Sequence, residues 1–431
     1  MPRHRILALG TLAVLAASAC DDAEPAAVEV GQGTPPAEVA VAPGGNGPTA
    51  APGLAGPDGS PLELTELSVP AADGAAEVTV EVLRTLTYRE GEDASVTPLA
   101  VSPSGEVLVS SMEPGTFDAG ALEMLATMPV DLWTADELVA LGSTEGLVPG
   151  DAHRQVVGGT FAAGLPAWHE TTGLQVGTSD WRMVAQSADG PALLARSEQL
   201  FPAGELPGLA GHPRLTAVGD RVGWETAEQR EDGTLRTRLV SVPVTGGELR
   251  TEAGLATMPV AAADGWVTVR LEDRDVVAVD EDDERLAAQT RIDLVTPGGE
   301  ARALVELSDL QVSQLAAGSG QVVAWADEEE VYVGTTGGSA VQRLVAAAGT
   351  SVVPWSLAVC DEHVVWGAFA ADGTATTYVL DPASGDIGAL PAVPGDTAVV
   401  CGGPYLAWTQ TDDGGERVVT LSRLTAPTGA R

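Results

Sequence analysis

Residues 215–224 read LTAVGDRVGW, which is a short apolar strand, a tight turn and a second strand that ends at Trp224. The same phrase returns around Trp266 (VAAADGWVTV) and at Trp325 (LAAGSGQVVAW), Trp366 (LAVCDEHVVW) and Trp408 (VVCGGPYLAW). The intervals between these tryptophans are 42, 59, 41 and 42 residues, and the long interval contains an extra acidic hairpin near Asp280–Glu284. Two weaker copies come earlier, FAAGLPAW ending at Trp168 and LAVSPSGEVLVS centred on Val109, which makes seven copies.

A repeat of this length, built from about four short strands, is typical of a β-propeller. Apolar runs alternate with Gly, Asp and Pro turns downstream of Glu77, and the best helical candidate, residues 119–128, is short. The sequence therefore predicts an all-β fold, a β-propeller of seven blades.

Closure of the ring is predicted from the two ends of the repeat region. The last copy ends with RVVTLSRL at Leu424, and the seven residues that follow are too few for a well-formed outer strand. The strand EVTVEVLRTL, residues 77–86, has no partner of its own. We expect it to complete the last blade, because closure of this kind protects sheet edges that would otherwise aggregate.

The recurring tryptophans are interpreted as core residues, because one large aromatic at the same strand position in each copy suits packing between blades. The alternative is an aromatic sugar-binding platform, which requires exposed rings. Trp133, Trp181 and Trp355 fall outside the main repeat position and are the better candidates for such a platform.

Two phrases, LAVSPSGE at residues 99–106 and YVLDPASGD at residues 378–386, resemble those of TolB-like and WD40-like propellers. The resemblance covers roughly residues 77–424, although the Gly-His and Trp-Asp pairs of WD40 repeats are missing. It implies the propeller fold and transfers no activity.

The N-terminus has the pattern of an export signal. Arg3, His4 and Arg5 precede an apolar run from Ile6 to Ala17, which is too short to span a bilayer as a helix. The next residues complete the segment ASAC, residues 17–20, which resembles a bacterial lipobox. The resemblance implies that Cys20 is acylated and becomes the mature N-terminus; the alternative is an ordinary signal peptide cut near Ala19.

The predicted domain organisation has three parts. Residues 1–19 form a signal peptide, residues 20–75 a lipid-anchored low-complexity linker, and residues 76–431 the propeller domain. The linker prediction rests on its richness in Ala, Pro, Gly and Glu and on its lack of aromatic residues. We expect an exported protein of the cell envelope, held by lipid at the inner or the outer membrane.

Charge and residue usage exclude several functions. The 61 acidic residues outnumber the 22 basic ones, for a net charge of -39, which opposes binding to nucleic acids and to anionic lipids. Contact with the membrane is therefore expected through the lipid alone. Every basic residue is arginine, which excludes a catalytic lysine within this chain. The spacing of His and Cys predicts no zinc site, and no metal or other cofactor is expected.

Cys360 and Cys401 occupy nearly the same place in consecutive copies, six and seven residues before the tryptophan. Because exported proteins meet oxidising conditions, we expect these two residues to form a disulfide between neighbouring inner strands. The alternative is a pair of separate buried thiols.

Other polar clusters are assigned structural roles. The acidic runs Asp280–Glu284 and Asp327–Glu330 could hold Ca²⁺, but their position at hairpins favours solvated turns. The pair His169 and Glu170 is adjacent on a strand, so the two side chains point to opposite faces.

No catalytic residues are assigned from the sequence, which contains neither a Gly-x-Ser-x-Gly elbow nor a phosphate-binding loop. The predicted function is a non-enzymatic scaffold that binds an envelope protein or a glycan. The alternative is a secreted hydrolase or lyase with a carboxylate or Ca²⁺ site in the propeller's central channel.

Overall fold

The fold was analysed in a computed structural model of the chain. The residues it describes are 53–87, 95–112, 116–118, 123–135, 137–148, 152–172, 180–200, 214–229, 235–272, 288–308, 310–327, 330–346, 356–369, 374–395, 397–411 and 416–425.

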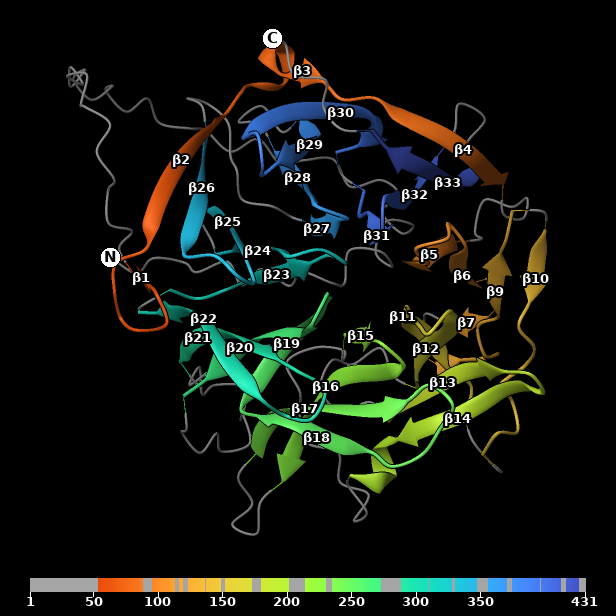
Figure 1. The fold of residues 1–431 in the computed structure, drawn as a ribbon. Helices are drawn as coiled ribbons and strands as arrows, with labels where there is room; N and C mark the ends of the chain where they lie inside the picture. Colours follow the sequence, from red (N-terminus) through yellow and green to blue (C-terminus); the bar gives the residue numbers. More distant parts are fainter. Residues whose placement is uncertain are drawn as a thin grey trace, which may run out of the picture. The chain divides into compact units, whose positions relative to one another are not determined.

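Seven antiparallel sheets follow one another along the chain and form the blades of a β-propeller (Figure 1). The prediction of an all-β, seven-bladed propeller is confirmed. Blade 1 contains β5 (Ser95–Val101), β6 (Val107–Met112), β9 (Val130–Trp133) and β10 (Leu138–Ala140). Blade 2 contains β11 (Gln155–Ala162), β12 (Leu165–Thr171), β13 (Trp181–Ser187) and β14 (Gly190–Arg196). Blade 3 contains β15 (Leu215–Val218), β16 (Arg221–Gln229), β17 (Leu235–Pro243) and β18 (Arg250–Gly254).

The second half of the ring follows the same order from inner to outer strand. Blade 4 contains β19 (Ala256–Ala262), β20 (Gly265–Leu271), β21 (Gln289–Val295) and β22 (Ala301–Leu307). Blade 5 contains β23 (Gln314–Ala317), β24 (Val322–Ala326), β25 (Val331–Thr335) and β26 (Ala340–Ala346). Blade 6 contains β27 (Ser356–Cys360), β28 (His363–Phe369), β29 (Ala375–Asp381) and β30 (Asp386–Pro394). Blade 7 contains β31 (Val400–Gly402), β32 (Tyr405–Thr411) and β33 (Arg417–Leu424).

Helical structure is confined, in the described part of the chain, to two single 3-10 turns, η1 (Ala72–Gly74) and η2 (Ser197–Gln199). The predicted helical candidate at 119–128 instead contains β8 (Glu123–Met124), which pairs with β7 (Phe117–Asp118). No helix among the described residues is long and apolar enough to cross a membrane.

The ring closes by strand exchange between the two ends of the chain. Strand β4 (Val80–Thr87) pairs antiparallel with β33 as the outer strand of blade 7, with Val80 opposite Leu424. The next strand along the chain, β5, is the inner strand of blade 1 and lies against β31 and β32 of blade 7. This confirms the predicted closure by residues 77–86.

Each interface between neighbouring blades contains one apolar cluster. The second strand of blades 2–7 contributes a fully buried tryptophan that faces the preceding blade, and these residues are Trp168, Trp224, Trp266, Trp325, Trp366 and Trp408. Close packing requires small partners. A Cβ on Gly223 of blade 3 would lie 2.9 Å from Nε1 of Trp266. The recurring tryptophans are therefore core residues, as predicted.

Blade 1 has Val109 at the repeat position, and Trp133 from its third strand supplies the aromatic side chain to the cluster shared with blade 7. Trp133 and Trp181 are only 6% and 3% exposed, so neither can form the aromatic platform considered above. Trp355 lies outside the described residues. The sequence could not show that Trp133 belongs to the core, because its position does not match that of the repeated tryptophans.

Residues 54–87 form a belt along the outer edges of four consecutive blades, visible as the orange segment at the periphery of Figure 1. After β1 (Leu54–Ala55), which pairs with β22, β2 (Glu63–Val69) adds in parallel to β26 and β3 (Ala76–Glu77) adds in parallel to β30. The belt ends in β4. Five of its apolar side chains are buried against the blades, and they are Leu54, Leu62, Leu64, Val69 and Val78. Val82 and Leu83 of β4 are exposed.

The belt changes the predicted boundary between linker and propeller. The linker was expected to extend to residue 75, whereas β1 and β2 belong to the sheets of blades 4 and 5. Local composition could not show this, because the few apolar residues of this segment are stabilised by distant blades and not by one another.

The closing interface also depends on Arg84 of β4. Its guanidinium donates hydrogen bonds to the carbonyls of Thr134 and Gly105 in blade 1, and it lies 4.8 Å from the ring centroid of Trp133. We predict that Arg84→Ala lowers the free energy of unfolding by about 2 kcal/mol, because two charge-assisted contacts between blades 7 and 1 are lost. Denaturant unfolding measures the difference. The matched control is Arg250→Ala on the exposed outer strand β18, where a change within about 0.5 kcal/mol is expected. Equal effects of the two substitutions would contradict the role given to Arg84.

Candidate active site

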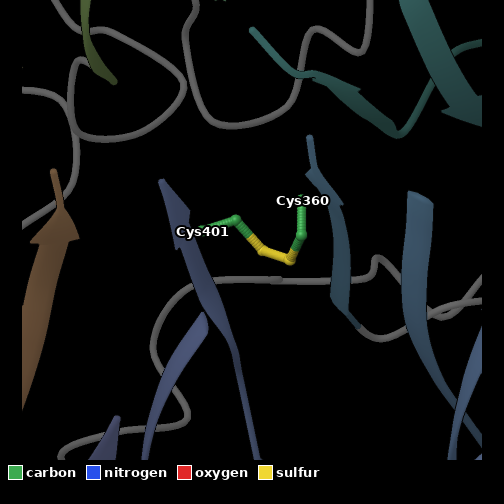
Figure 2. The surroundings of a disulfide bond; sticks show 2 residues. All are labelled: Cys360 and Cys401. Carbon is green, nitrogen blue, oxygen red and sulfur yellow. A yellow bond between two sulfur atoms is a disulfide. The ribbon is translucent and has the colours of Figure 1, made fainter. Parts of the chain in front are cut away.

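The predicted cysteine pair forms a disulfide in the structure (Figure 2). Cys360 ends β27 and Cys401 lies in β31, so the bond joins the inner strands of blades 6 and 7. Cys360 is fully buried. The bond reinforces the interface between blades 6 and 7, next to the closing interface between blades 7 and 1, and we assign it a structural role. Cys20, the predicted lipidation site, lies outside the described residues.

Glu170 is held in a buried network in blade 2. Its carboxylate accepts hydrogen bonds from Nε1 of Trp168 at 2.7 Å and from Nε of Arg182 at 2.6 Å. Arg182 also donates to the carbonyl of Thr144 at 3.2 Å, which links the blade to the preceding connection. His169 and Glu170 are both fully buried. The network therefore stabilises the blade and offers no group to a substrate.

The acidic run Asp327–Glu330 lies at the hairpin between β24 and β25, as predicted. Glu330 accepts hydrogen bonds from Tyr332 and Arg343, and Arg343 also donates to Glu66 of the belt at 3.1 Å. No group of metal-ligating side chains is found among the described residues. The run Asp280–Glu284 lies outside those residues.

A different set of polar residues meets at one face of the ring. We call this the strand-start face, because the seven inner strands begin there. Arg214 directly precedes β15, and Glu225 of β16 lies one position beyond the pair formed by Leu215 and Trp224. The side chains of Arg214 and Glu225 are close enough to interact electrostatically.

The side chain of Glu225 extends from blade 3 to the beginning of the inner strand β19 of blade 4. Its Oε2 accepts hydrogen bonds from the hydroxyl of Thr257 at 2.7 Å and from the backbone N–H of Met258 at 2.8 Å. Strand β19 is bulged here, and Met258 and Leu255 both have positive φ, at 54° and 55°. Such backbone costs free energy for residues other than glycine and often occurs at functional sites. Glu225 stabilises the strained conformation by binding its N–H group.

Arg214 extends in the same region toward blade 5. Its Nη1 lies 3.5 Å from the carbonyl oxygen of Leu315 in β23, two blades further round the ring. The arginine is exposed, and Glu225 is half-buried. Three consecutive blades, 3, 4 and 5, thus contribute residues to a site that solvent can reach.

Burial shifts the pKa of both groups. It raises the pKa of the Glu225 carboxyl, although the hydrogen bonds from Met258 and Thr257 and the charge of Arg214 act in the opposite direction. Burial also lowers the pKa of Arg214, which the charge of Glu225 partly offsets. A carboxyl group with a raised pKa can exchange protons at higher pH than an ordinary glutamate does, while the neighbouring guanidinium can bind an anionic group.

Sequence reasoning missed this site. Neither Arg214 nor Glu225 belongs to a motif, and their proximity depends on strand pairing inside blade 3 and on the bulge in blade 4. The only local signal is that Arg214 directly precedes, and Glu225 directly follows, the repeated phrase at residues 215–224.

No protein-family model and no curated protein sequence matches the chain. Solved structures do match. A prolyl endopeptidase structure is 13% identical with a TM-score of 0.49, over 76% of this chain and 46% of that one. An oligogalacturonate lyase from Vibrio parahaemolyticus is 10% identical with a TM-score of 0.48, over 81% of this chain and 99% of that one. A puromycin hydrolase is 16% identical with a TM-score of 0.44, over 80% of this chain and 55% of that one.

The chain spans about half the length of the prolyl endopeptidase and of the puromycin hydrolase. At these identities the likeness concerns the fold alone. The non-enzymatic scaffold expected from the sequence is not supported by these comparisons, whose named proteins are a prolyl endopeptidase, a lyase and a hydrolase. The repeat pattern alone could not decide between a scaffold and an enzyme, because propellers with and without activity share it.

The disulfide yields a prediction about stability. The double variant Cys360→Ala/Cys401→Ala should lose about 4 kcal/mol of unfolding free energy, because the bond closes a long loop in the unfolded chain. Urea unfolding measures the loss. Reductant should destabilise the unmodified protein by a similar amount and leave the double variant unchanged. Equal stability of the two proteins under oxidising conditions would contradict the prediction.

Glu225 yields a prediction about pH. Its pKa is higher in the folded than in the unfolded protein, so its contribution is fully present below the unfolded value and is lost as pH rises through the folded value. Glu225→Gln cannot ionise, and its amide oxygen can still accept from Thr257 and Met258. The variant should therefore gain stability relative to the unmodified protein as pH rises above the ordinary pKa range of a glutamate.

Melting temperatures of both proteins across this pH range measure the effect. Glu300→Gln, at an exposed turn of blade 4, is the control and should show no such trend. A stability difference that stays constant with pH would show that burial does not raise the pKa of Glu225.

Proposed function

We propose that this protein is an exported enzyme of the hydrolase or lyase class, whose acid–base group is Glu225 at the strand-start face. The observation that carries the proposal is the pairing of a half-buried carboxyl group, whose pKa burial raises, with an exposed guanidinium. General acid–base catalysis is most effective when the pKa of the catalytic group lies near the working pH.

The two oxygens of Glu225 have different roles in this proposal. Oε2 is held by Thr257 and Met258, which fixes the orientation of the carboxyl group. Oε1 makes no hydrogen bond within the described part of the chain, so it is the atom that exchanges a proton with substrate. The ionised form accepts a proton from the reacting group or from water, and the protonated form returns it to the leaving group.

The enzyme acts at the cell envelope in this proposal. The signal sequence supports export, and acylation of Cys20 would anchor the mature chain in the membrane. The segment between Cys20 and β1 would then hold the propeller near substrates of the envelope, which are glycans or peptides. Catalysis requires no lysine, and every basic residue of the chain is arginine.

The test is turnover by the full-length protein on two sets of substrates, oligogalacturonates and peptidyl or aminoacyl amides. The substrate types named for the similar structures guide this choice. Glu225→Gln should lower kcat/KM by about 100-fold or more, and the activity of the unmodified protein should depend on a group that titrates above the usual range of a glutamate.

Glu300→Gln, on the surface of blade 4, is the matched control and should retain full activity. Retained activity in Glu225→Gln would overturn the assignment of this residue. If neither set of substrates is turned over, the hydrolase or lyase proposal loses its support.

A further inference from the structure

Arg214 differs from those arginines of the described residues that form ion pairs. Seven arginines pair with carboxylates, and they are Arg154, Arg182, Arg196, Arg221, Arg250, Arg291 and Arg343. Arg214 has a carboxylate nearby, but Glu225 directs its bound oxygen to Thr257 and Met258. The guanidinium of Arg214 therefore interacts with the charge of Glu225 but forms no ion pair with a carboxylate of the described residues.

The hydrogen bonding of Arg214 is far from complete. A guanidinium has five N–H donors, and the bond from Nη1 to the Leu315 carbonyl is 3.5 Å long, at the limit for a hydrogen bond. The side chain is exposed at the strand-start face, so the remaining donors are accessible. It is also surrounded by enough protein to be partly desolvated. A cation in such surroundings interacts more strongly with an anion than a cation in bulk water does.

We propose that Arg214 binds a carboxylate of the substrate, so that the site selects acidic substrates. The inference rests on the proposed function, because it names the substrate class of the same site. Arg214 binds the carboxylate through two parallel N–H donors, the geometry that guanidinium and carboxylate groups share. The weak bond to Leu315 is given up in exchange. Substrate is thereby held next to Oε1 of Glu225.

The charge of the chain makes this arginine necessary. A net charge of -39 repels anionic ligands at long range. An acidic substrate can therefore bind only where a local cation outweighs this repulsion at short distance. Salt reduces the long-range repulsion more than the contact with Arg214, because screening acts over roughly 8–10 Å at physiological ionic strength.

Two sources can supply the carboxylate, a sugar acid or the C-terminus of a peptide, and the experiment separates them. Calorimetry measures binding of an oligogalacturonate and of its methyl ester, and of a peptide with a free C-terminus and of its amide. The full-length Glu225→Gln protein is used to prevent turnover. In one of the two pairs the free acid should bind at least about tenfold more tightly than its neutral form.

Variants of Arg214 then test the assignment in the same Glu225→Gln background. Arg214→Met should abolish the preference for the acid, and Arg214→Lys should retain part of it, because lysine keeps the charge and loses the two-donor geometry. Arg250→Met, at an exposed outer strand, is the control and should leave the preference unchanged. Melting temperatures establish that each variant is folded.

The outcomes separate this inference from the proposed function. Equal binding of acid and neutral forms, failure of both acids to bind, or a preference that survives in Arg214→Met would overturn the carboxylate site. Turnover that is unaffected by Glu225→Gln would overturn the catalytic assignment while leaving a measured preference for acids intact.

Discussion

The pairing of β4 with β33 is the constraint on which the rest of the structure depends. Seven blades form seven interfaces only when the first blade packs against the last. The pairing of β4 with β33 brings these two blades together. The closing interface is also where the repeat is weakest, because blade 1 has Val109 in place of a tryptophan. Trp133 and the guanidinium of Arg84 make up for that loss from a different strand and from the belt.

The belt extends the same principle beyond blade 7. Outer strands of a propeller leave backbone donors and acceptors unpaired, and β1, β2 and β3 cover those of blades 4, 5 and 6. The ion pair between Arg343 and Glu66 fixes β2 to its blade. The N-terminal segment therefore joins the propeller at blade 4, three blades before the closing strand.

The sequence predicted those features that repeat at a constant interval. The tryptophan spacing was sufficient for the blade number, and the lone strand near Val80 was sufficient for closure. Features that depend on one interface only were not predictable. Trp133 substitutes for a missing repeat residue, and the two-residue strands β1 and β3 have no local pattern. Arg214 and Glu225 come together through strand pairing and a bulge that no spacing in the sequence encodes.

The architecture explains how Arg214 and Glu225 can be held beside strained backbone at the strand-start face. The core of each interface is filled by a tryptophan and its neighbours, so the ring does not rely on the ends of its inner strands for stability. Those ends are free to hold strained backbone such as Met258, provided that a nearby group compensates for the strain. Glu225 does so through its hydrogen bond to the Met258 N–H, and the same burial that strengthens this bond raises the pKa of the carboxyl. A single residue thereby links the stability of the bulge to the protonation state on which the proposed chemistry depends.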